Sequence, residues 1–555
     1  MGAILSTLLG PLKPLVTAIG ILRDLAKQFS AADARFNEDP GLPRAAPTRP
    51  FWLDEPPFPE LADIQSEILP EQADVIIIGS GISGVAIARS LFEASPSASV
   101  VVVEARQLCS GATGRNGGHI KASPHETIEH LITKLGMPGE RAAALVRFQL
   151  AHLENLVALC ESDADLLAIS ECRKVETVDL IVEDKIFTDV KHSVALLNKW
   201  VPEFKMTTWS AAEAQQKFSA GPHVVGAVTY DAGALWPYRF VTALWRHLLD
   251  AHPDLLSIET STPAEAVATD RSTPDYPYRV TTPRGTIRAR HVVHATNAFA
   301  SHLLPELRRK VTGLRAHMSA QRPGPKFPDL DGARSWSIIY NAGFDYISQR
   351  PSRTVRDGET TVREAGEVMT GGGFVRSADQ GLDQLGVFDD TTTDFFTGLH
   401  LHGILPTTFG PYWGSDAANS GRTDYATGEG HVTKLWSGII GFSADMIPLV
   451  GRLESKITGR SLAATKRASS TTGTGAGAVE PGEWISAVFQ GDGMVWAWLS
   501  GTALGIMLAG REQEDLPPAP GRPSGCVVDW FPKEMRPTHD RLKKIDITNL
   551  ADLLL

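Results

Sequence analysis

The stretch from Gly79 to Gly84 reads GSGISG, with the spacing G-x-G-x-x-G that suits the binding of phosphate groups. It follows an apolar run, Ala73–Gly79, and leads into a helical pattern from Ser83 to Glu93. In this setting the first glycine allows a tight turn, the second lets the backbone approach a pyrophosphate, and the third lets the helix pack closely on the strand. Free amides at the helix start attract phosphate charge, so the spacing predicts a dinucleotide site. The alternative is a glycine-rich turn that merely joins strand to helix.

An acidic residue ends the second apolar run, Ser99–Glu104. Strand, helix and strand within about thirty residues predict a right-handed crossover in a parallel sheet that is buried on both faces. Glu104 is then placed to accept hydrogen bonds from a ribose hydroxyl. Because its charge would repel a 2′-phosphate, the residue disfavours NADP.

The twelve residues from Cys109 to Ile120, CSGATGRNGGHI, contain four glycines and two small hydroxyl residues, Ser110 and Thr113. Bare backbone of this kind can lie flat against a long dinucleotide and offer it N–H groups, while Arg115 and Asn116 reach its polar atoms. An NAD-dependent dehydrogenase would instead continue from the acid into another helix and strand. The stretch therefore favours FAD over NAD. A solvent loop with glycines for flexibility is the alternative.

A second glycine turn, Gly491-Asp492-Gly493-Met494, comes directly before an apolar helical pattern. Free N–H groups at such a helix start can stabilise negative charge on a reduced flavin. An ordinary core helix that begins with glycine is the alternative.

Three segments, IIGSGISG, VVVEAR and SGATGRNGGH, together resemble the FAD-dependent oxidoreductases of the D-amino-acid oxidase type. That class also contains glycine, sarcosine and γ-glutamylputrescine oxidases. The resemblance runs in pieces from about Asp74 to Gly510, and the pieces follow the order found in the family. The further segments that carry it are Ala234–Leu244, Thr262–Val267, Val292–Leu307, Lys434–Gly451 and Phe489–Gly510.

The resemblance implies an α/β fold, in which a Rossmann-like FAD-binding domain is interleaved with an α+β substrate domain that contains a mixed or antiparallel sheet. It implies hydride transfer from a carbon that bears an amine to the flavin, hydrolysis of the imine, and reoxidation by dioxygen. It also places backbone near Val267 against adenine and Thr296 close to the flavin. The residues predicted to hold FAD are Gly79, Ser80, Gly81, Ser83, Gly84, Glu104, Ala105, Arg106, Ser110, Gly111, Ala112, Thr113, Arg115, Asn116, Gly117, Gly118, Val267, Thr296, Gly491, Asp492, Gly493 and Met494.

Four residues are candidates for contact with a small amine or amino-acid substrate. His119 follows the glycine run and can orient substrate or bond covalently to the flavin; a structural hydrogen bond to the loop is the alternative. The resemblance implies that Tyr340, Tyr346 and Arg350 lie on substrate-domain strands, where an arginine pairs bidentately with a carboxylate. For Arg350 a solvent-facing sheet edge is the alternative. Cys109 raises the same covalent question as His119, without support from its spacing.

One departure from the family leaves the oxidant open. Relatives of the sarcosine oxidase type carry a lysine that activates oxygen, whereas the comparable segment here, Gly366–Phe374, contains none. An FAD-dependent dehydrogenase or biosynthetic oxidoreductase that acts on a specialised metabolite is therefore an alternative to an oxidase. The sequence also does not distinguish a primary amine from a secondary one.

Three readings from other classes compete with this one. An NAD-dependent dehydrogenase lacks its expected helix and strand after Glu104. A flavin monooxygenase needs a second nucleotide site, and the only comparable glycine run, Gly473–Ala478, follows no apolar strand pattern. A non-enzymatic flavoprotein with a structural cofactor stays open, and reduction of the bound flavin by an amine would exclude it.

The composition narrows the class of protein further. A net charge of −11 and a pI near 5.8 argue against a nucleic-acid binder, which needs a basic face to meet phosphates. The four cysteines are widely scattered and form neither a zinc pattern nor a disulfide framework, so we expect a reducing compartment and no metal site.

The N-terminal residues, Gly2 to Leu22, are largely apolar but are interrupted by Pro11, Lys13 and Pro14. A spanning helix needs about 20 mostly uninterrupted apolar residues, so we expect a helix that docks on the protein's own surface. Weak membrane association is the alternative, because Met1–Ser6 fits the loose myristoylation pattern. We expect a cytoplasmic protein, since the C-terminus carries no peroxisomal S-K-L signal.

The expected domain organisation is discontinuous. Residues 1–70 form an apolar helix and a proline-rich arm, and residues 516–555 form a C-terminal tail. The FAD-binding domain takes residues 71–135, 225–310 and 431–515, and the substrate domain takes residues 136–224 and 311–430. Residues 455–482, rich in Ser, Thr, Gly and Ala, form a flexible insertion.

Overall fold

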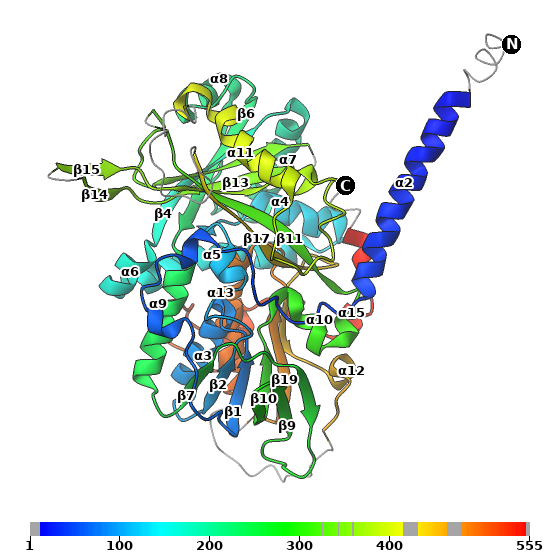
Figure 1. The fold of residues 1–555 in the computed structure, drawn as a ribbon, viewed down its shortest axis with the longest axis vertical. Helices are drawn as coiled ribbons and strands as arrows, with labels where there is room; N and C mark the ends of the chain where they lie inside the picture. The colour runs from blue at the N-terminus through cyan, green and yellow to red at the C-terminus, as the bar shows by residue number, and fades with distance from the viewer. Residues whose placement is uncertain are drawn as a thin grey trace.

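The computed structural model contains two large β-sheets surrounded by helices (Figure 1). The α-helices are α2 Leu12–Asn37, α3 Ile82–Ala94, α4 Pro124–Glu129, α5 Gly139–Glu161, α6 Ala164–Ser170, α7 Asp184–Trp200, α8 Ala211–Phe218, α9 Pro237–Ala251, α10 Ala300–Leu303, α11 Phe395–Phe409, α12 Ser455–Thr458, α13 Ala497–Leu508, α14 Val527–Trp530 and α15 His539–Leu542. The structure describes residues 12–324, 326–341, 343–357, 360–414, 431–462 and 479–550.

The first sheet has the strand order β18-β19-β10-β1-β2-β7, and β8 and β9 extend it from β10. The pairs β19–β10, β10–β1, β1–β2 and β2–β7 are parallel, as the crossover pattern predicts. The strands are β1 Gln72–Ile78, β2 Val100–Val103, β7 Leu256–Glu259, β8 Ala266–Thr269, β9 Tyr278–Thr282, β10 Gly285–His294, β18 Leu449–Arg452 and β19 Gly482–Ala487.

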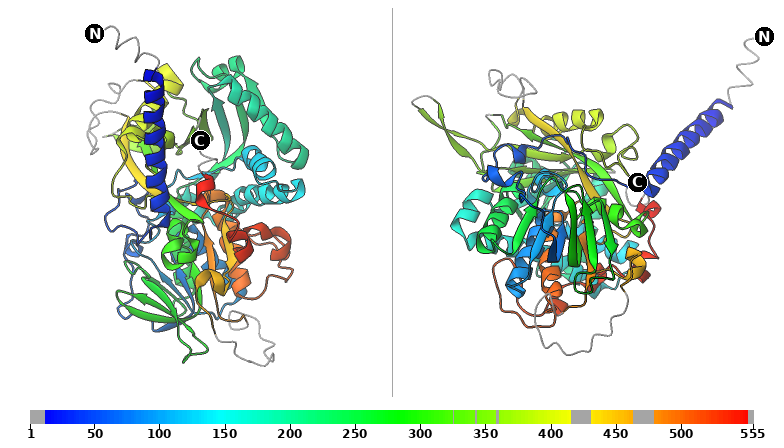
Figure 2. Two further views of the ribbon diagram at one scale, coloured as in Figure 1. Left: turned by 90° about the vertical axis from the view of Figure 1, so that its right-hand side faces the viewer. Right: turned by 60° about the horizontal axis from the view of Figure 1, so that its bottom comes forward.

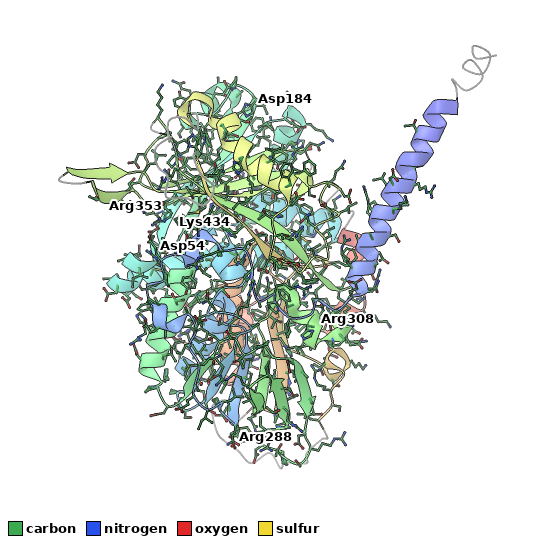
Figure 3. The ribbon with its side chains drawn as sticks, viewed as in Figure 1. Asp54, Asp184, Arg288, Arg308, Arg353 and Lys434 are labelled. Carbon is green, nitrogen blue, oxygen red and sulfur yellow. The ribbon has the colours of Figure 1, made fainter. Side chains whose placement is uncertain are left out.

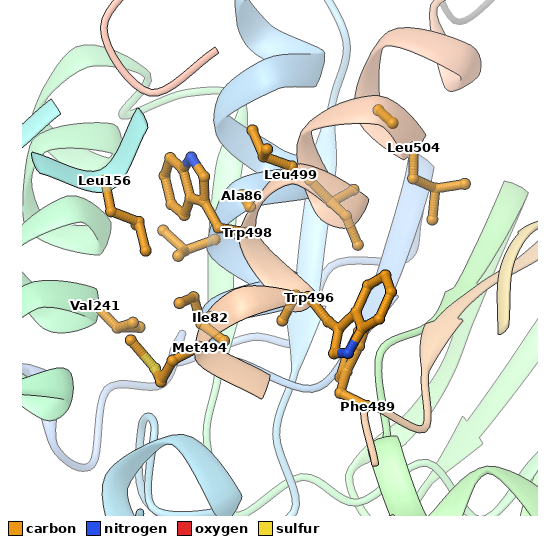
Figure 4. Close-up of a cluster of buried hydrophobic side chains, with 14 of the residues drawn as sticks. Ile82, Ala86, Leu156, Val241, Phe489, Met494, Trp496, Trp498, Leu499 and Leu504 are labelled. Carbon is orange, nitrogen blue, oxygen red and sulfur yellow. The ribbon is translucent and has the colours of Figure 1, made fainter. Parts of the chain in front are cut away.

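The apolar run of β1 is buried on both faces of this sheet. Val75 and Ile77 pack in one hydrophobic cluster with α3, α9 and α13, whereas Ile76 and Ile78 pack in another cluster with β8, β9 and β10. Figure 4 shows the helical side of this core, where the labelled Ile82 of α3 lies among Trp498 and other apolar side chains of α13. Burial on both faces explains why β1 has continuous apolar residues instead of alternating ones.

The second sheet is mostly antiparallel and has the order β17-β11-β16-β13-β12-β4-β6-β3, with β5 beside β6. Only β4 and β12 pair in parallel among the described strands of this sheet. Two further strands, β14 Arg353–Asp357 and β15 Thr360–Glu364, form a separate ribbon. The sheet strands are β3 His119–Ile120, β4 Arg173–Ile181, β5 Thr207–Ser210, β6 Gly226–Ala234, β11 Val311–Gln321, β12 Arg334–Tyr340, β13 Gly343–Gln349, β16 Val368–Gly372 and β17 Val432–Ser443.

The strand pairing differs from the expected domain boundaries in three places. β3, β6 and β17 fall in ranges assigned to the FAD-binding domain, yet all three pair into the second sheet. β4 lies in a stretch whose helical patterns hid it. A strand's partner is set by contacts distant in sequence, so an extended pattern alone does not tell which sheet it joins.

The N-terminal helix α2 projects from the body of the protein (Figures 1 and 2). Only its C-terminal end is docked, because Ala32 and Phe36 are buried and the Arg35 guanidinium donates to the carbonyl oxygens of Leu385 and Leu382 at 2.7 and 2.6 Å. The expected surface docking therefore holds for one end of the helix. Residues 1–11, including the myristoylation pattern, lie outside the described residues.

Among the described helices, α5 alone is long and apolar enough to cross a membrane, and 56% of its apolar window is buried inside the protein. The burial of this helix is typical of a core helix.

The proline-rich arm that follows α2 is held by ion pairs near both of its ends. Asp39 pairs with Arg308 at 2.9 Å, and Asp54 pairs with Lys434 of β17. Figure 3 labels Arg308, Asp54 and Lys434, and Asp54 lies beside Lys434 where the arm passes the second sheet. The arm is thus tied at both of its ends.

The structure describes part of each of the two remaining expected segments. The proposed insertion at residues 455–482 begins with the short helix α12, and its residues 463–478 lie outside the described residues. The C-terminal tail is described to residue 550 and docks on the body, where Arg541 pairs with Asp445 at 2.8 Å.

Close packing between α3 and α13 yields a test of the fold. A Cβ at Gly505 would lie 2.0 Å from the Ser90 hydroxyl oxygen and 2.5 Å from the Ile87 carbonyl oxygen. We therefore expect Gly505→Ala to lower the free energy of unfolding by about 1–3 kcal/mol in urea denaturation. The control is Gly403→Ala in α11, where nothing lies within 4 Å, and this change should be neutral or stabilising. Equal stability of the two variants would contradict the packing described.

Candidate functional site

A cavity of about 630 Å³ joins the two sheets. At one end it is lined by Glu104, which follows β2 of the first sheet, and by the first turn of α3. At the other end it is lined by Asp179 of β4, Ser337 of β12 and Tyr346 of β13, all from the second sheet. The carboxyl ends of parallel strands in an open α/β sheet are the usual place for a ligand.

Glycine is required where β1 turns into α3. Gly79 has a φ of +111°, and a Cβ there would lie 2.6 Å from the Ala295 carbonyl oxygen. A Cβ at Gly84 would lie 2.2 Å from the Gly79 carbonyl oxygen, so this residue lets helix and strand pack closely and does not line the cavity. Gly81 does line it, with the Thr113 hydroxyl directly beside its Cα. The turn therefore presents bare backbone to the cavity.

Glu104 is held in place by the backbone around it. One carboxylate oxygen accepts from the Ser80 amide at 3.1 Å and from its hydroxyl at 2.7 Å, and the other accepts from the Arg106 amide at 3.0 Å. The second oxygen, which accepts only one hydrogen bond, keeps a lone pair that can accept a ribose hydroxyl.

The glycine-rich loop after Glu104 lies along the cavity, but its arginine points elsewhere. Arg115 donates to the Ser437 carbonyl oxygen at 2.8 Å and to the Thr48 hydroxyl at 2.7 Å, and it lies 3.5 Å from Asp390. Burial lowers the pKa of Arg115 to about 10, although the charge of Asp390 opposes this shift. The guanidinium therefore ties the arm to β17, in place of the predicted contact with polar atoms of FAD.

Sequence reasoning missed the part of the cavity that the arm provides. Gly41, Leu42 and Pro43 line the cavity near His302, which accepts or donates a 2.8 Å hydrogen bond with Asp39. No local sequence pattern identifies these residues as part of a site, because a proline-rich arm has the same composition whether or not it covers one.

The second glycine turn carries an unusual acid. Asp492 lines the cavity, and its side chain is exposed there. Burial first, and then the charge of Glu126, raise the pKa of Asp492 to about 7, while Lys121 lowers it. The Asp492 carboxyl forms no hydrogen bond among the described residues. It can therefore exchange a proton near neutral pH.

Two of the four candidate substrate residues line the cavity. His119 forms a 2.8 Å hydrogen bond with the Ser335 hydroxyl, and burial, aided by Lys121 and Arg173, holds the pKa of His119 well below its usual value. The imidazole is therefore neutral. The hydrogen bond joins it to β12 of the substrate sheet instead of the loop.

Tyr346 forms a wall of the cavity and is clamped between two glycines. A Cβ at Gly117 would lie 2.6 Å from its ring, and one at Gly371 would lie 2.4 Å from it. The phenol donates to the Met318 sulfur at 2.9 Å, and burial raises the pKa of Tyr346, so the phenol stays neutral. The position suits contact with substrate.

The other two candidates lie outside the cavity, which corrects their expected role. Arg350 pairs with Glu171 and Glu367, each at 2.6 Å, and stacks over the Trp236 ring at 4.4 Å. Tyr340 lies in the hydrophobic cluster of the second sheet, with its ring 5.9 Å from that of His400. Alternation along β12 turns Tyr340 to the face opposite Ser337, away from the cavity. Arg350 follows the end of β13 and is held by its two acids, so neither side chain can bind a carboxylate in the cavity.

A buried charged network on the substrate side was also missed. Lys121 pairs with Asp179 of β4 and donates to the hydroxyl of Ser337, and the Tyr230 hydroxyl donates to Asp179 at 2.8 Å. Lys121 and Asp179 line the cavity with side chains only 8% and 2% exposed. A lone acid within the mostly apolar run TVDLIV was the signal that could have found Asp179, because a buried acid needs a partner.

The structure brings most of the predicted cofactor residues to one cavity. Ser110, Gly118 and Val267 do not line it, and Ala264 lies there in place of Val267. Val267 is instead packed in the core beside β9. Those that line the cavity are Gly79, Ser80, Gly81, Ser83, Glu104, Ala105, Arg106, Gly111, Ala112, Thr113, Arg115, Asn116, Gly117, Thr296, Gly491, Asp492, Gly493 and Met494.

A dinucleotide turn on a parallel sheet, with a second sheet closing the cavity beyond it, defines a two-domain nucleotide-dependent oxidoreductase. Residues 74–505 match the family model of the FAD dependent oxidoreductases, so the chain belongs to that family. The probable oxidoreductase OrdL of Haemophilus influenzae is 22% identical over 289 residues, which are 51% of this chain and 61% of OrdL. The match thus spans less than two thirds of that relative.

Solved structures share the fold at low sequence identity. L-proline dehydrogenase from P. horikoshii has a TM-score of 0.57 and 17% identity, with 86% of this chain and 100% of that chain covered. Glycine oxidase from Geobacillus kaustophilus has a TM-score of 0.54 and 17% identity, with 81% and 98% covered. An L-amino acid deaminase from Proteus vulgaris has a TM-score of 0.54 and 16% identity, with 87% and 99% covered.

FAD is the cofactor of this family, and the cavity fits it. The first turn of α3 offers amides that have no partner within the helix, which suits a pyrophosphate. Glu104 suits the ribose. Thr296 lines the cavity with a buried hydroxyl that has no hydrogen-bond partner among the described residues, so a ligand group can satisfy it.

The raised pKa of Asp492 yields a test of the site's electrostatics. Between about pH 4 and pH 7 the folded carboxyl keeps a proton that the unfolded one, with an ordinary pKa of 3.8, has lost. Wild-type stability should therefore fall with rising pH over this window relative to Asp492→Asn. We expect the two proteins to unfold alike near pH 4 and the variant to be more stable above pH 7, as measured by urea denaturation. A stability difference that is constant across this range would contradict the burial of this acid.

Proposed function

We propose that the protein oxidises a C–N bond of an amine or amino acid by hydride transfer to FAD. The observation that carries this proposal is the continuous cavity, which runs from the dinucleotide turn to polar side chains of the second sheet. Solved relatives with this fold are named as a proline dehydrogenase, a glycine oxidase and an amino acid deaminase, which supports the same type of substrate here.

The bound flavin supplies the hydride acceptor, and the chain supplies position and charge. Tyr346 and Met318 form a rigid apolar wall that can hold the reacting carbon. The amides that begin at Gly491 face the cavity ahead of α13 and can stabilise negative charge. Asp492 can take a proton from the substrate nitrogen, because its pKa of about 7 allows it to ionise at neutral pH.

Dioxygen is the oxidant that we propose for the second half of the reaction. The segment around β16 provides no lysine, but Lys121, which follows the edge strand β3, brings an ammonium group into the same cavity, where it pairs with Asp179. Although it is paired, this fixed positive charge can still help to stabilise the negative charge that develops when oxygen accepts an electron.

We further propose a cytoplasmic location with weak membrane contact through α2. The cysteines at positions 109, 160, 172 and 526 are free, in keeping with a reducing compartment. Leu22, Leu25 and Phe29 are exposed on the projecting helix and offer an apolar surface.

Anaerobic absorption spectra test the proposed reaction. We expect the visible flavin bands of the purified protein to bleach when one class of amine or amino acid is added, because the substrate delivers two electrons to the cofactor. Admission of air should then restore the bands within seconds. Bands that bleach with dithionite but with no amine or amino acid would contradict the proposal. Bands that stay bleached in air would favour a dehydrogenase.

A further inference from the structure

The substrate end of the cavity carries more negative than positive charge. Three carboxylates, those of Glu126, Asp179 and Asp492, and one ammonium, that of Lys121, line it. The sum is a net charge of −2 when all are ionised. His119 and His130 add no charge, because burial lowers the pKa of each imidazole.

Each cation that lines the cavity already has an anionic partner. Lys121 pairs with Asp179 and also donates to Ser337. At the dinucleotide end, Arg106 pairs with Asp390 at 2.9 Å, and Arg115 lies 3.5 Å from the same acid. A buried carboxylate needs a positive partner, and among the described lining residues none is left to provide one.

Asp492 differs from these cations because its carboxyl has no hydrogen-bond partner among the described residues. Its side chain is exposed in the cavity. Glu126 lines the same cavity, and its negative charge helps to raise the pKa of Asp492. A cationic group placed between them would relieve both the missing hydrogen bonds and the repulsion.

We propose that this cavity selects a cationic amine that bears no carboxylate next to the reacting carbon, and that Asp492 and Glu126 bind its ammonium group. This inference rests on the proposed function and narrows its substrate from amines and amino acids to amines. Asp492 accepts the extra ammonium proton on a carboxylate oxygen, so the nitrogen lone pair becomes free before the C–H bond breaks. The carboxylate of an α-amino acid would lie in a cavity lined by three acids, where every described lining cation is already paired with another acid.

Binding of inert ions tests the charge preference without turnover. Tetramethylammonium and acetate, at equal ionic strength, would be titrated into the FAD-loaded protein at pH 8 while the flavin absorption bands are recorded. We expect saturable perturbation by tetramethylammonium and none by acetate. Asp492→Asn should weaken tetramethylammonium binding by about tenfold or more, because a carboxylate that attracts the cation is replaced by a neutral amide. The control, Glu154→Gln, alters an exposed acid that pairs with Lys174 and should change nothing. Tighter binding of acetate than of tetramethylammonium would overturn the inference.

Matched substrate pairs test the same preference in the reaction. Pyrrolidine against proline and cadaverine against lysine differ only by a carboxylate, and anaerobic bleaching rates would be compared within each pair. We expect the amine of the active pair to bleach the flavin at least about tenfold faster, the factor that 1.4 kcal/mol represents. Faster bleaching by the amino acids would overturn the inference and leave the proposed function standing. If no compound bleaches the flavin, the proposed function fails, and the ion titration alone decides the charge preference.

Discussion

Close contact between backbone and backbone, where β1 turns into α3, is the constraint on which the rest of the structure depends. The turn at Gly79 brings the strand within reach of Ala295, and Gly84 lets the helix start lie against the strand end. This contact leaves the first-turn amides of α3 facing the cavity, where they attract a pyrophosphate. The tight approach of α13 through Gly505 then fixes the second glycine turn at the far end of the same cavity.

Each described cation that lines the cavity is paired with an acid of the protein itself, so none of them is free to pair with a substrate carboxylate. Asp390 serves Arg106 and Arg115, and through them ties the proline-rich arm across the cofactor site. Asp179 serves Lys121 on the substrate side. A buried charge without a partner is costly, so these ion pairs stabilise the cavity. Among the described residues Asp492 has no such partner, so its carboxylate can bind a cation and accept a proton.

The cofactor half could be predicted from the sequence, whereas the substrate half could not. The turn at Gly79–Gly84, the acid at Glu104 and the loop that follows lie within one continuous segment, so their spacing alone carries the geometry. Arg350 was expected to bind substrate, but it pairs with Glu171 and Glu367, and the pairing with Glu171 joins residues far apart in the sequence that no local pattern reveals. Asp179 was missed for the same reason, since β4 reaches the cavity only through pairing with β6 and β12.

The central claim is that the cavity holds FAD, and we expect the cofactor to be bound without a covalent bond. Cys109 does not line the cavity, and the Nε2 atom of His119, which does line it, is engaged by the Ser335 hydroxyl. Acid precipitation of the purified yellow protein, followed by chromatography of the supernatant, tests this claim most directly. The structure predicts one equivalent of free FAD per chain in the supernatant and a colourless pellet. Flavin that stays with the pellet would contradict the non-covalent site, and a protein that neither contains nor takes up FAD would contradict the account as a whole.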